Sequence, residues 1–213
     1  MVNDGRLSSS WGFRLPAVAL LGLLILSCAG AITHPVYIRY QGTPEAGRNV
    51  GGTVALQPFV DRRQENDPNL VGYRSLSGGR RERYATIPEN VAEAVTRAVA
   101  NRLERTGADI VPLKGWEYTP EEIVASESTA DYWLGGEIEQ LHCEAKKELL
   151  GTTLKVEAHL VFYLGDPKSR QVRRRPVQIR IERFEAIFKP EKVELRVNEA
   201  VTEAMDRGLG RLD

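Results

Sequence analysis

Hydrophobic and polar residues alternate most regularly in the C-terminal half of the chain, which predicts three long strands. Tyr132–Lys147 alternates with one phase slip between Ile138 and Leu141, which indicates a β-bulge. The next stretch has polar residues on one face and six apolar residues at every second position on the other: Leu154, Val156, Ala158, Leu160, Phe162 and Leu164. The turn 165–169 leads to a third strand between Val177 and Phe188. Short turns between successive strands predict an antiparallel three-strand meander.

Helical spacing of apolar residues predicts two amphipathic helices. The first follows the segment 86–89, which matches a capping box, and ends near Gly107. Its apolar face is expected to contain Val91, Val95, Ala98, Val99 and Leu103. The second opens at 189–191 and has its own apolar face: Val193, Val197, Ala200, Val201 and Ala204. A shorter helix is expected from Thr119 to about Ser126.

The remaining segments complete a predicted α+β domain. Thr53–Val60 is rich in β-forming residues, and Ile110-Val111 is a second short strand. Residues 61–85 contain three glycines and many charges, so we expect a long loop there. The prediction is therefore a single α+β domain over residues 53–213. Its sheet is mainly antiparallel and contains the meander, and the two amphipathic helices pack on one face.

The first thirty residues have the layout of an export signal. Arg6 and Arg14 precede Leu15–Leu26, an uncharged apolar run of 12 residues. This length is typical of a secretory signal and short of the roughly 20 residues that span a bilayer. The run overlaps Ile25-Leu26-Ser27-Cys28, which resembles the lipobox of bacterial lipoproteins, although Leu26 is bulkier than the usual residue there. The resemblance implies that residues 1–27 are a signal peptide and that Cys28 carries lipid.

An uncleaved membrane anchor is the alternative interpretation. If the count continues through Ile32, the uncharged stretch reaches 18 residues, which is borderline for spanning a bilayer. Ser-Cys-Ala-Gly at 27–30 suits a processing site better than the end of a spanning helix. Ala29 stands where an Asp would resemble the inner-membrane retention signal, so the expected location is the outer membrane, facing the periplasm.

Residues 28–52 are predicted to be a tether between the lipid and the domain. Several glycines and prolines interrupt this segment, including Pro35, Pro44 and the pair Gly51-Gly52. Val36–Tyr40 within it is β-prone, and the sequence leaves open whether it is an edge strand or lies along the domain. A chain that begins near Gly51 is expected to fold cooperatively.

Charge and cysteine content exclude some functions. The full chain has 29 Lys and Arg and 29 Asp and Glu residues. Removal of residues 1–27 takes away Arg6, Arg14 and Asp4, which leaves 27 basic and 28 acidic residues, a net charge near −1. This balance argues against a general nucleic-acid binder. Since Cys28 is expected to be lipidated, Cys143 is the one remaining thiol, and no intramolecular disulfide is expected.

Candidate catalytic and metal-binding residues are sparse, and no cofactor, metal site or catalytic residue is predicted. His34, His142 and His159 lack metal-ligand spacing, and His142 and Cys143 point to opposite faces of a strand. Cys143 shares the phase of Leu141 and is expected in the core. Two basic segments remain as weak candidates: Gly78–Arg81 for anion binding, and Arg173–Arg175 for contact with a lipid headgroup or a partner. Both are ordinary on solvated surfaces, and we predict that the protein is not an enzyme.

The layout resembles the family of small envelope lipoproteins typified by YajG. The resemblance rests on the lipobox, the Val60-Asp61-Arg62-Arg63 turn, the capped helix, the Gly136-Glu137-Ile138 strand and the C-terminal helix. It implies an envelope location and an α+β fold more than an activity. The outline also resembles auxiliary lipoproteins of envelope lipid and lipopolysaccharide transport.

From these resemblances we expect a non-enzymatic, lipid-anchored protein that binds another envelope component. The alternative is an accessory subunit of a lipid or lipopolysaccharide transport system, which adjacent genes for an ATPase or permease would favour. The partner that the sequence predicts is membrane lipid at the acylated N-terminus, together with an unidentified envelope protein.

Overall fold

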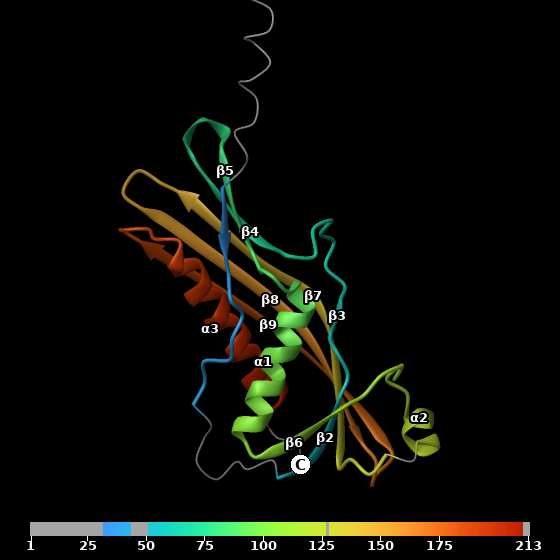
Figure 1. The fold of residues 1–213 in the computed structure, drawn as a ribbon. Coiled ribbons are helices and arrows are strands. Elements are labelled where there is room, and N and C mark those ends of the chain that lie inside the picture. Colours follow the sequence, from blue (N-terminus) through green and yellow to red (C-terminus); the bar gives the residue numbers. More distant parts are fainter. Residues whose placement is uncertain (1–31, 44–50, 127, 211–213) are drawn as a thin grey trace, which may run out of the picture. The chain divides into compact units, whose positions relative to one another are not determined.

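A computed structural model of the protein describes residues 32–43, 51–126 and 128–210 (Figure 1). These residues contain nine strands, three α-helices and one short 3-10 turn. The strands are β1 (Thr33–Pro35), β2 (Gly52–Leu56), β3 (Val60–Asp61), β4 (Leu70–Ser75), β5 (Arg81–Ala85), β6 (Ala108–Pro112), β7 (Tyr132–Lys147), β8 (Thr152–Asp166) and β9 (Gln171–Glu185). The helices are α1 (Val91–Arg105), α2 (Pro120–Ala125) and α3 (Glu191–Gly208). Over the described ranges, no helix combines the length and the apolar character needed to cross a membrane.

The nine strands form one sheet in which β7 is central. On one side β7 pairs antiparallel with β8, and β8 pairs antiparallel with β9, which confirms the predicted meander. The predicted bulge in β7 is present between Ile138 and Gln140. On its other side β7 pairs in parallel with β2, β3 and β4, one after another along its length. β2 then pairs with β6, while β4 pairs with β5 and β5 with β1.

The prediction of a mainly antiparallel sheet is wrong, because the sheet is mixed. Strands joined by short turns are indeed antiparallel in the three hairpins β4–β5, β7–β8 and β8–β9. β2, β3 and β4 are separated from β7 by long connections, which can return the chain in the same direction. The segment between β2 and β6 contains α1, and these two strands are likewise parallel.

The prediction of a long loop over residues 61–85 is also wrong, because most of this segment forms the β4–β5 hairpin. Leu70, Val71 and Tyr84 are buried, while charged residues and glycines interrupt the apolar pattern that would identify a strand. Gly72 is needed for the pairing of β4 with β7. A Cβ at this position would lie 1.8 Å from the carbonyl oxygen of Cys143, so no side chain fits.

The core lies between the sheet and the helices α1 and α3, which cover the same face (Figure 1). Every residue predicted for the apolar faces of these two helices is buried. α1 begins later than predicted, at Val91, because Asn90 and Glu93 form the capping box. Thr86 bonds to Asn69 instead: the Asn69 carbonyl oxygen accepts from the Thr86 backbone N–H over 2.8 Å and from its hydroxyl over 3.3 Å.

Residues 36–42 pack between α1 and α3, and we call this segment the strap (Figure 1). Val36, Ile38 and Tyr40 are almost completely buried. The backbone is held mainly by α3: Arg39 N–H donates to Oδ1 of Asn198 over 2.8 Å, and Gln41 N–H donates to Oγ1 of Thr202 over 2.9 Å. This part of the predicted tether therefore lies along the domain and completes its core, the second of the two possibilities that the sequence left open.

Among the described residues, those that cover the opposite face of the sheet lie near one end of it. There α2 and its flanking loops pack on β7 and β8 and form a second apolar cluster: Ala55, Trp116, Ile123, Ala130 and Trp133. Trp116 lies edge-on to Trp133 with ring centroids 5.4 Å apart. Beyond this cluster, the side of β7, β8 and β9 that faces away from α1 and α3 carries exposed and half-buried polar side chains. We call this side the open face.

The two faces of β8 predict unequal effects of two alanine substitutions. Leu160 is fully buried toward the helices, so Leu160→Ala should lower the free energy of unfolding by about 2–5 kcal/mol. Lys155 lies on the open face and is 34% exposed, so Lys155→Ala should change it by less than about 0.5 kcal/mol. Thermal or denaturant melts of both variants measure the difference. Equal losses of unfolding free energy in the two variants would mean that other parts of the protein cover the open face at Lys155 as well.

Candidate functional site

The predicted lipidation site, Cys28, lies outside the described residues, as does the signal peptide 1–27. Lipid attachment there stays a prediction. The described residue nearest to Cys28 in the sequence is Ile32, whose carbonyl oxygen accepts a hydrogen bond from Arg83 N–H over 2.8 Å. The described residues therefore begin four positions after Cys28 in the sequence.

The structure separates the three histidines from one another. His34 stacks on Tyr84 in the β1–β5 pair, with ring centroids 5.2 Å apart. His142 and His159 both lie on the open face, but they face different carboxylates: Nδ1 of His142 is 3.8 Å from Glu65, and Nδ1 of His159 is 2.9 Å from Glu139. In the described residues no three His, Cys, Asp or Glu side chains are grouped so that they could hold a metal ion.

Cys143 points toward the helices, as its phase with Leu141 predicts. The side chain is completely buried, and this burial raises the pKa of the thiol to about 12. A neutral thiol in this environment is a packing group and a poor nucleophile.

The two basic segments lie at opposite ends of the sheet. Gly78–Arg81 forms the turn of the β4–β5 hairpin, where Gly78 and Gly79 both have positive φ. Arg173–Arg175 belongs to β9 rather than to the segment before it. Arg174 contacts Glu139 over 3.4 Å, and Arg175 donates to the carbonyl oxygen of Gly208 over 3.3 Å.

A groove of about 600 Å³ lies where the segment after β3 meets the bulge of β7. Its lining consists of Arg62, Arg63, Gln64, Glu65, Glu139, Gln140, Leu141 and His142. The bulge contributes to this lining, because Glu139 is the residue left without a partner between Ile138 and Gln140 in the register with β8.

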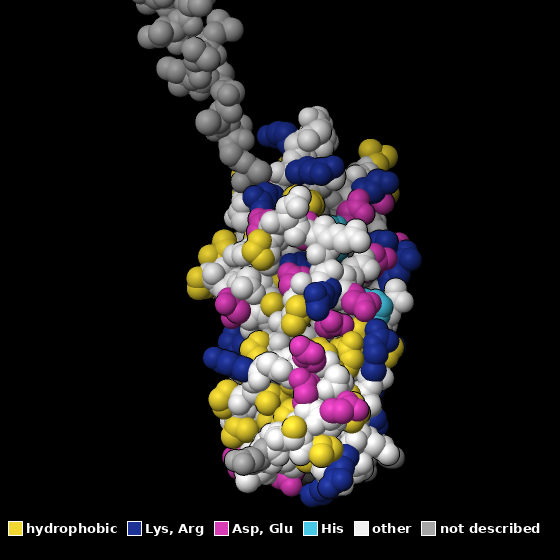
Figure 2. All heavy atoms as spheres, turned by 90° about the vertical axis from the view of Figure 1, so that its right-hand side faces the viewer, with side chains coloured by type: hydrophobic (Ala, Val, Ile, Leu, Met, Phe, Trp, Pro, Cys, Tyr) yellow, Lys and Arg dark blue, Asp and Glu magenta, His cyan; other side chains and the backbone are white. Residues whose placement is uncertain are grey.

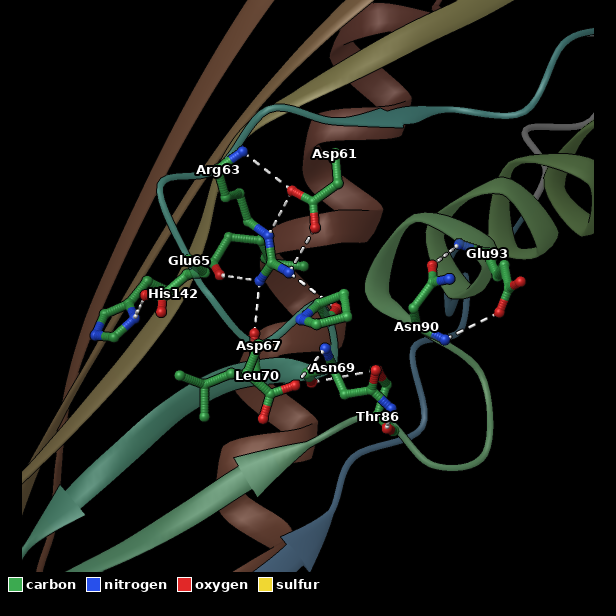
Figure 3. Close-up of polar contacts among 12 residues, drawn as sticks. Asp61, Arg63, Glu65, Asp67, Asn69, Leu70, Thr86, Asn90, Glu93 and His142 are labelled. Carbon is green, nitrogen blue, oxygen red and sulfur yellow. Dashed lines mark hydrogen bonds and ion pairs between the residues drawn. The ribbon is translucent and has the colours of Figure 1, made fainter.

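Arg63, one of the lining residues of the groove, forms a hub of polar contacts with Asp61 (Figure 3). Nε and Nη2 of Arg63 donate to the two carboxylate oxygens of Asp61 over 2.9 and 2.8 Å. Nη1 also donates to the carbonyl oxygens of Leu70 and Leu141, which belong to β4 and β7. The Arg63 side chain is only 3% exposed, so its donors serve the fold and leave little for a ligand.

The hub predicts a loss of stability in acid. Burial raises the pKa of Asp61, but hydrogen bonds from the Arg63 side chain and backbone outweigh it, and the pKa lies below its ordinary value. A carboxyl with a lowered folded-state pKa adds stability above its unfolded pKa of about 4 and loses it as pH falls through the folded pKa.

Urea melts between about pH 6 and pH 3 test this expectation, with Asp61→Asn as the comparison. The wild-type chain should lose more stability over this range than the variant. Equal losses would mean that Arg63 does not favour the ionised carboxylate.

Polar groups on the open face are joined in pairs and short chains. Glu137 contacts Arg62 over 3.3 Å and accepts a hydrogen bond from the Tyr163 hydroxyl over 3.0 Å. Glu157 contacts Lys155 over 2.8 Å and accepts from Gln140 over 2.9 Å. Figure 2 shows acidic, basic and histidine side chains mixed along the right-hand side of its view. Alternating charges of this kind suit a multi-point polar contact with a large partner.

Sequence reasoning identified the Val60–Arg63 turn by resemblance but missed what its side chains do. The signal was a strand ending in Asp-x-Arg, yet the acceptors at Leu70 and Leu141 become neighbours only in the folded sheet. It also missed the stacking of Tyr118 on Tyr163, whose centroids are 3.9 Å apart, because these residues are 45 positions apart in the sequence.

Comparison with known proteins establishes the fold of this chain. No family model matches the sequence, and no curated protein matches it. A crystal structure of protein XCC0632 from Xanthomonas campestris, of the DUF330 family, has a TM-score of 0.52 and 12% identity, and covers 82% of this chain and 90% of that chain. At this identity the likeness establishes a common α+β fold.

Two further crystal structures are less similar. The hypothetical protein CT253 from Chlamydia trachomatis has a TM-score of 0.44 and 12% identity, and covers 76% of this chain and 99% of that chain. Lipoprotein GNA1162 from Neisseria meningitidis has a TM-score of 0.39 and 10% identity, with coverage of 71% and 96%. Scores of this size carry no conclusion about the present chain.

Proposed function

We propose that the protein is a non-enzymatic lipoprotein of the bacterial envelope, held in the membrane by lipid on Cys28, and that it binds another envelope component. The observation that carries the proposal is the 12-residue apolar run Leu15–Leu26 followed by Ser27-Cys28-Ala29, a few residues before the first described residue, Ile32. Two or three acyl chains hold a soluble domain stably at a membrane. The proposed location is the outer membrane, since Ala29 stands where an Asp would resemble the inner-membrane retention signal.

The open face is the proposed binding surface. Its ionisable groups contact one another, as Glu157 does with Lys155 and His159 does with Glu139. Charged groups of both signs on one surface favour complementary polar contacts with a partner. The bulge and the groove beside it give the surface a shape that a partner can match.

Photo-crosslinking in intact cells tests this proposal. A photoreactive residue at Arg180, on the open face, should give a specific adduct with an envelope protein. Arg207 on α3 is the matched control, since the two side chains are 61% and 60% exposed. An adduct from Arg207 and none from Arg180 would place the partner on the helices and contradict the proposal. An adduct that contains a permease, an ATPase or a barrel would identify the transport-subunit form of the function.

A further inference from the structure

Strand register aligns one end of the sheet in a single row of residues. Starting at β9, each residue pairs with the next across β8, β7, β4 and β5: Phe184, Thr153, Lys146, Ser75 and Arg81. Beyond this row lie the β4–β5 turn, the β7–β8 turn and the segment that follows β9. We call residues 76–81, 146–151 and 184–189 together the sheet tip, which is at the top in Figure 1.

The sheet tip exposes large apolar side chains that the fold does not use. Leu149 is 98% exposed, Leu150 is 80% exposed, and Ile187 and Phe184 are 76% and 56% exposed. A single exposed leucine needs no explanation, but four large apolar residues at the same end of a sheet indicate a surface that meets an apolar phase.

The same three segments also carry basic residues. The sheet tip contains Arg80, Arg81, Lys146, Lys147 and Lys189, all exposed. Its acidic residues are Glu148 and Glu185, and Glu185 is neutralised by Arg196 and Lys192 at 2.9 and 3.6 Å. Figure 2 shows Lys and Arg side chains at the top of its view. Exposed apolar residues together with Lys and Arg are typical of surfaces that lie in the interface of an anionic bilayer.

The described part of the chain begins at this same end. β1 runs parallel to β5 with Thr33 opposite Arg83, so Ile32 lies on the side of Arg81. Cys28 precedes Ile32 by four residues, which span at most about 14 Å of extended chain. Ile32 is itself 61% exposed. Lipid on Cys28 therefore limits how far the sheet tip can move from the headgroups.

We propose that the sheet tip docks on the membrane, with Leu149, Leu150, Phe184 and Ile187 in the headgroup and upper acyl region and the basic residues against anionic phosphates. This inference rests on the proposed lipidation of Cys28, which supplies the membrane and the short tether. Docking fixes the orientation of the domain, so that the long strands run away from the membrane and the open face is presented to the periplasm.

A fluorophore attached at each end of the sheet tests the docking. Leu150→Cys places an environment-sensitive nitrobenzoxadiazole dye at the β7–β8 turn, and Lys168→Cys places it at the β8–β9 turn. The two side chains are 80% and 78% exposed, and β8, 15 residues long, holds the turns roughly 45–50 Å apart. Cys143 does not compete for the dye, because it is buried with a raised pKa.

The full chain is expressed in bacteria, purified with its lipid, labelled and reconstituted in vesicles of phosphatidylcholine and phosphatidylglycerol. Nitroxide on the acyl chains of the vesicle lipid should quench the dye at position 150 at least about twofold and leave position 168 almost unchanged. Equal quenching at the two positions would overturn the inference. A blue-shifted dye at position 150 that lipid nitroxide does not quench would also overturn it, since a protein would then cover the sheet tip.

A chain that is not lipidated can be distinguished from a lipidated chain that does not dock. A chain without acyl groups has a free thiol at Cys28, which takes up the dye and changes the mass of the N-terminal peptide. An acylated chain whose position 150 remains as accessible to water as position 168 contradicts the docking alone.

Discussion

Replacing Arg63 by alanine is expected to lower the free energy of unfolding by about 3–5 kcal/mol, the cost of removing one partner of a buried ion pair. The substitution leaves the carboxylate of Asp61 without its bidentate partner. It also removes the donors that reach the carbonyl oxygens of Leu70, Pro68 and Leu141. Pro68 and Leu70 lie just before and at the start of β4, and Leu141 lies in β7, so the loss should loosen the pairing of β4 with β7.

Arg62→Ala is the matched control for this prediction. Arg62 is the neighbouring residue, with a side chain 62% exposed and one contact to Glu137 at 3.3 Å. An exposed ion pair contributes about 0–1 kcal/mol, so the control should melt close to the wild type. Denaturant melts of the two variants are the measurement. If both variants melt alike, the hub does not stabilise the fold.

Loss of the strap should have an even larger effect. A chain that begins at Gly51 lacks Val36, Ile38 and Tyr40, each 5% exposed or less. At roughly 1.5–3 kcal/mol per buried side chain, the loss amounts to about 5–9 kcal/mol. This is comparable to the whole stability of a typical domain. The structure thus revises the sequence-based expectation that such a chain folds cooperatively.

Calorimetry of chains that begin at Ile32 and at Gly51 measures the combined contribution of β1 and the strap. The longer chain should give a cooperative transition, and the shorter one should give a broad transition or none. A point variant distinguishes lost packing from a general effect of truncation, because Ile38 is fully buried whereas Tyr37 is 42% exposed. Ile38→Ala should cost about 2–5 kcal/mol and Tyr37→Ala much less. Similar cooperative melts of the two chains would contradict the prediction.

The local pattern of apolar and polar residues was sufficient to predict elements whose structure depends on residues close in the sequence. The meander from Tyr132 to Glu185, its bulge and the apolar faces of α1 and α3 follow from periodicity over short windows. The β4–β5 hairpin could not be predicted in this way. Its strand β4 contains Gly72, which is required by the backbone of Cys143, a residue 71 positions away.

The strap and the hub also depend on contacts between distant parts of the chain. The strap has the composition of a loop, and its partners Asn198 and Thr202 lie about 160 residues later in the sequence. The acceptors of Arg63 likewise lie in β4 and β7. The candidate lipidation site, by contrast, is a local motif, so the sequence alone predicts it.

Mass spectrometry of the N-terminal peptide from the membrane fraction tests the lipidation of Cys28, with Cys28→Ser as the comparison. We expect that the wild-type protein begins at Cys28, carries acyl groups there and incorporates labelled palmitate. The variant should keep residues 1–27 and incorporate no label, because the thiol is the acyl acceptor. Undiminished palmitate labelling of Cys28→Ser, or a wild-type chain with an unmodified Cys28, would contradict this expectation.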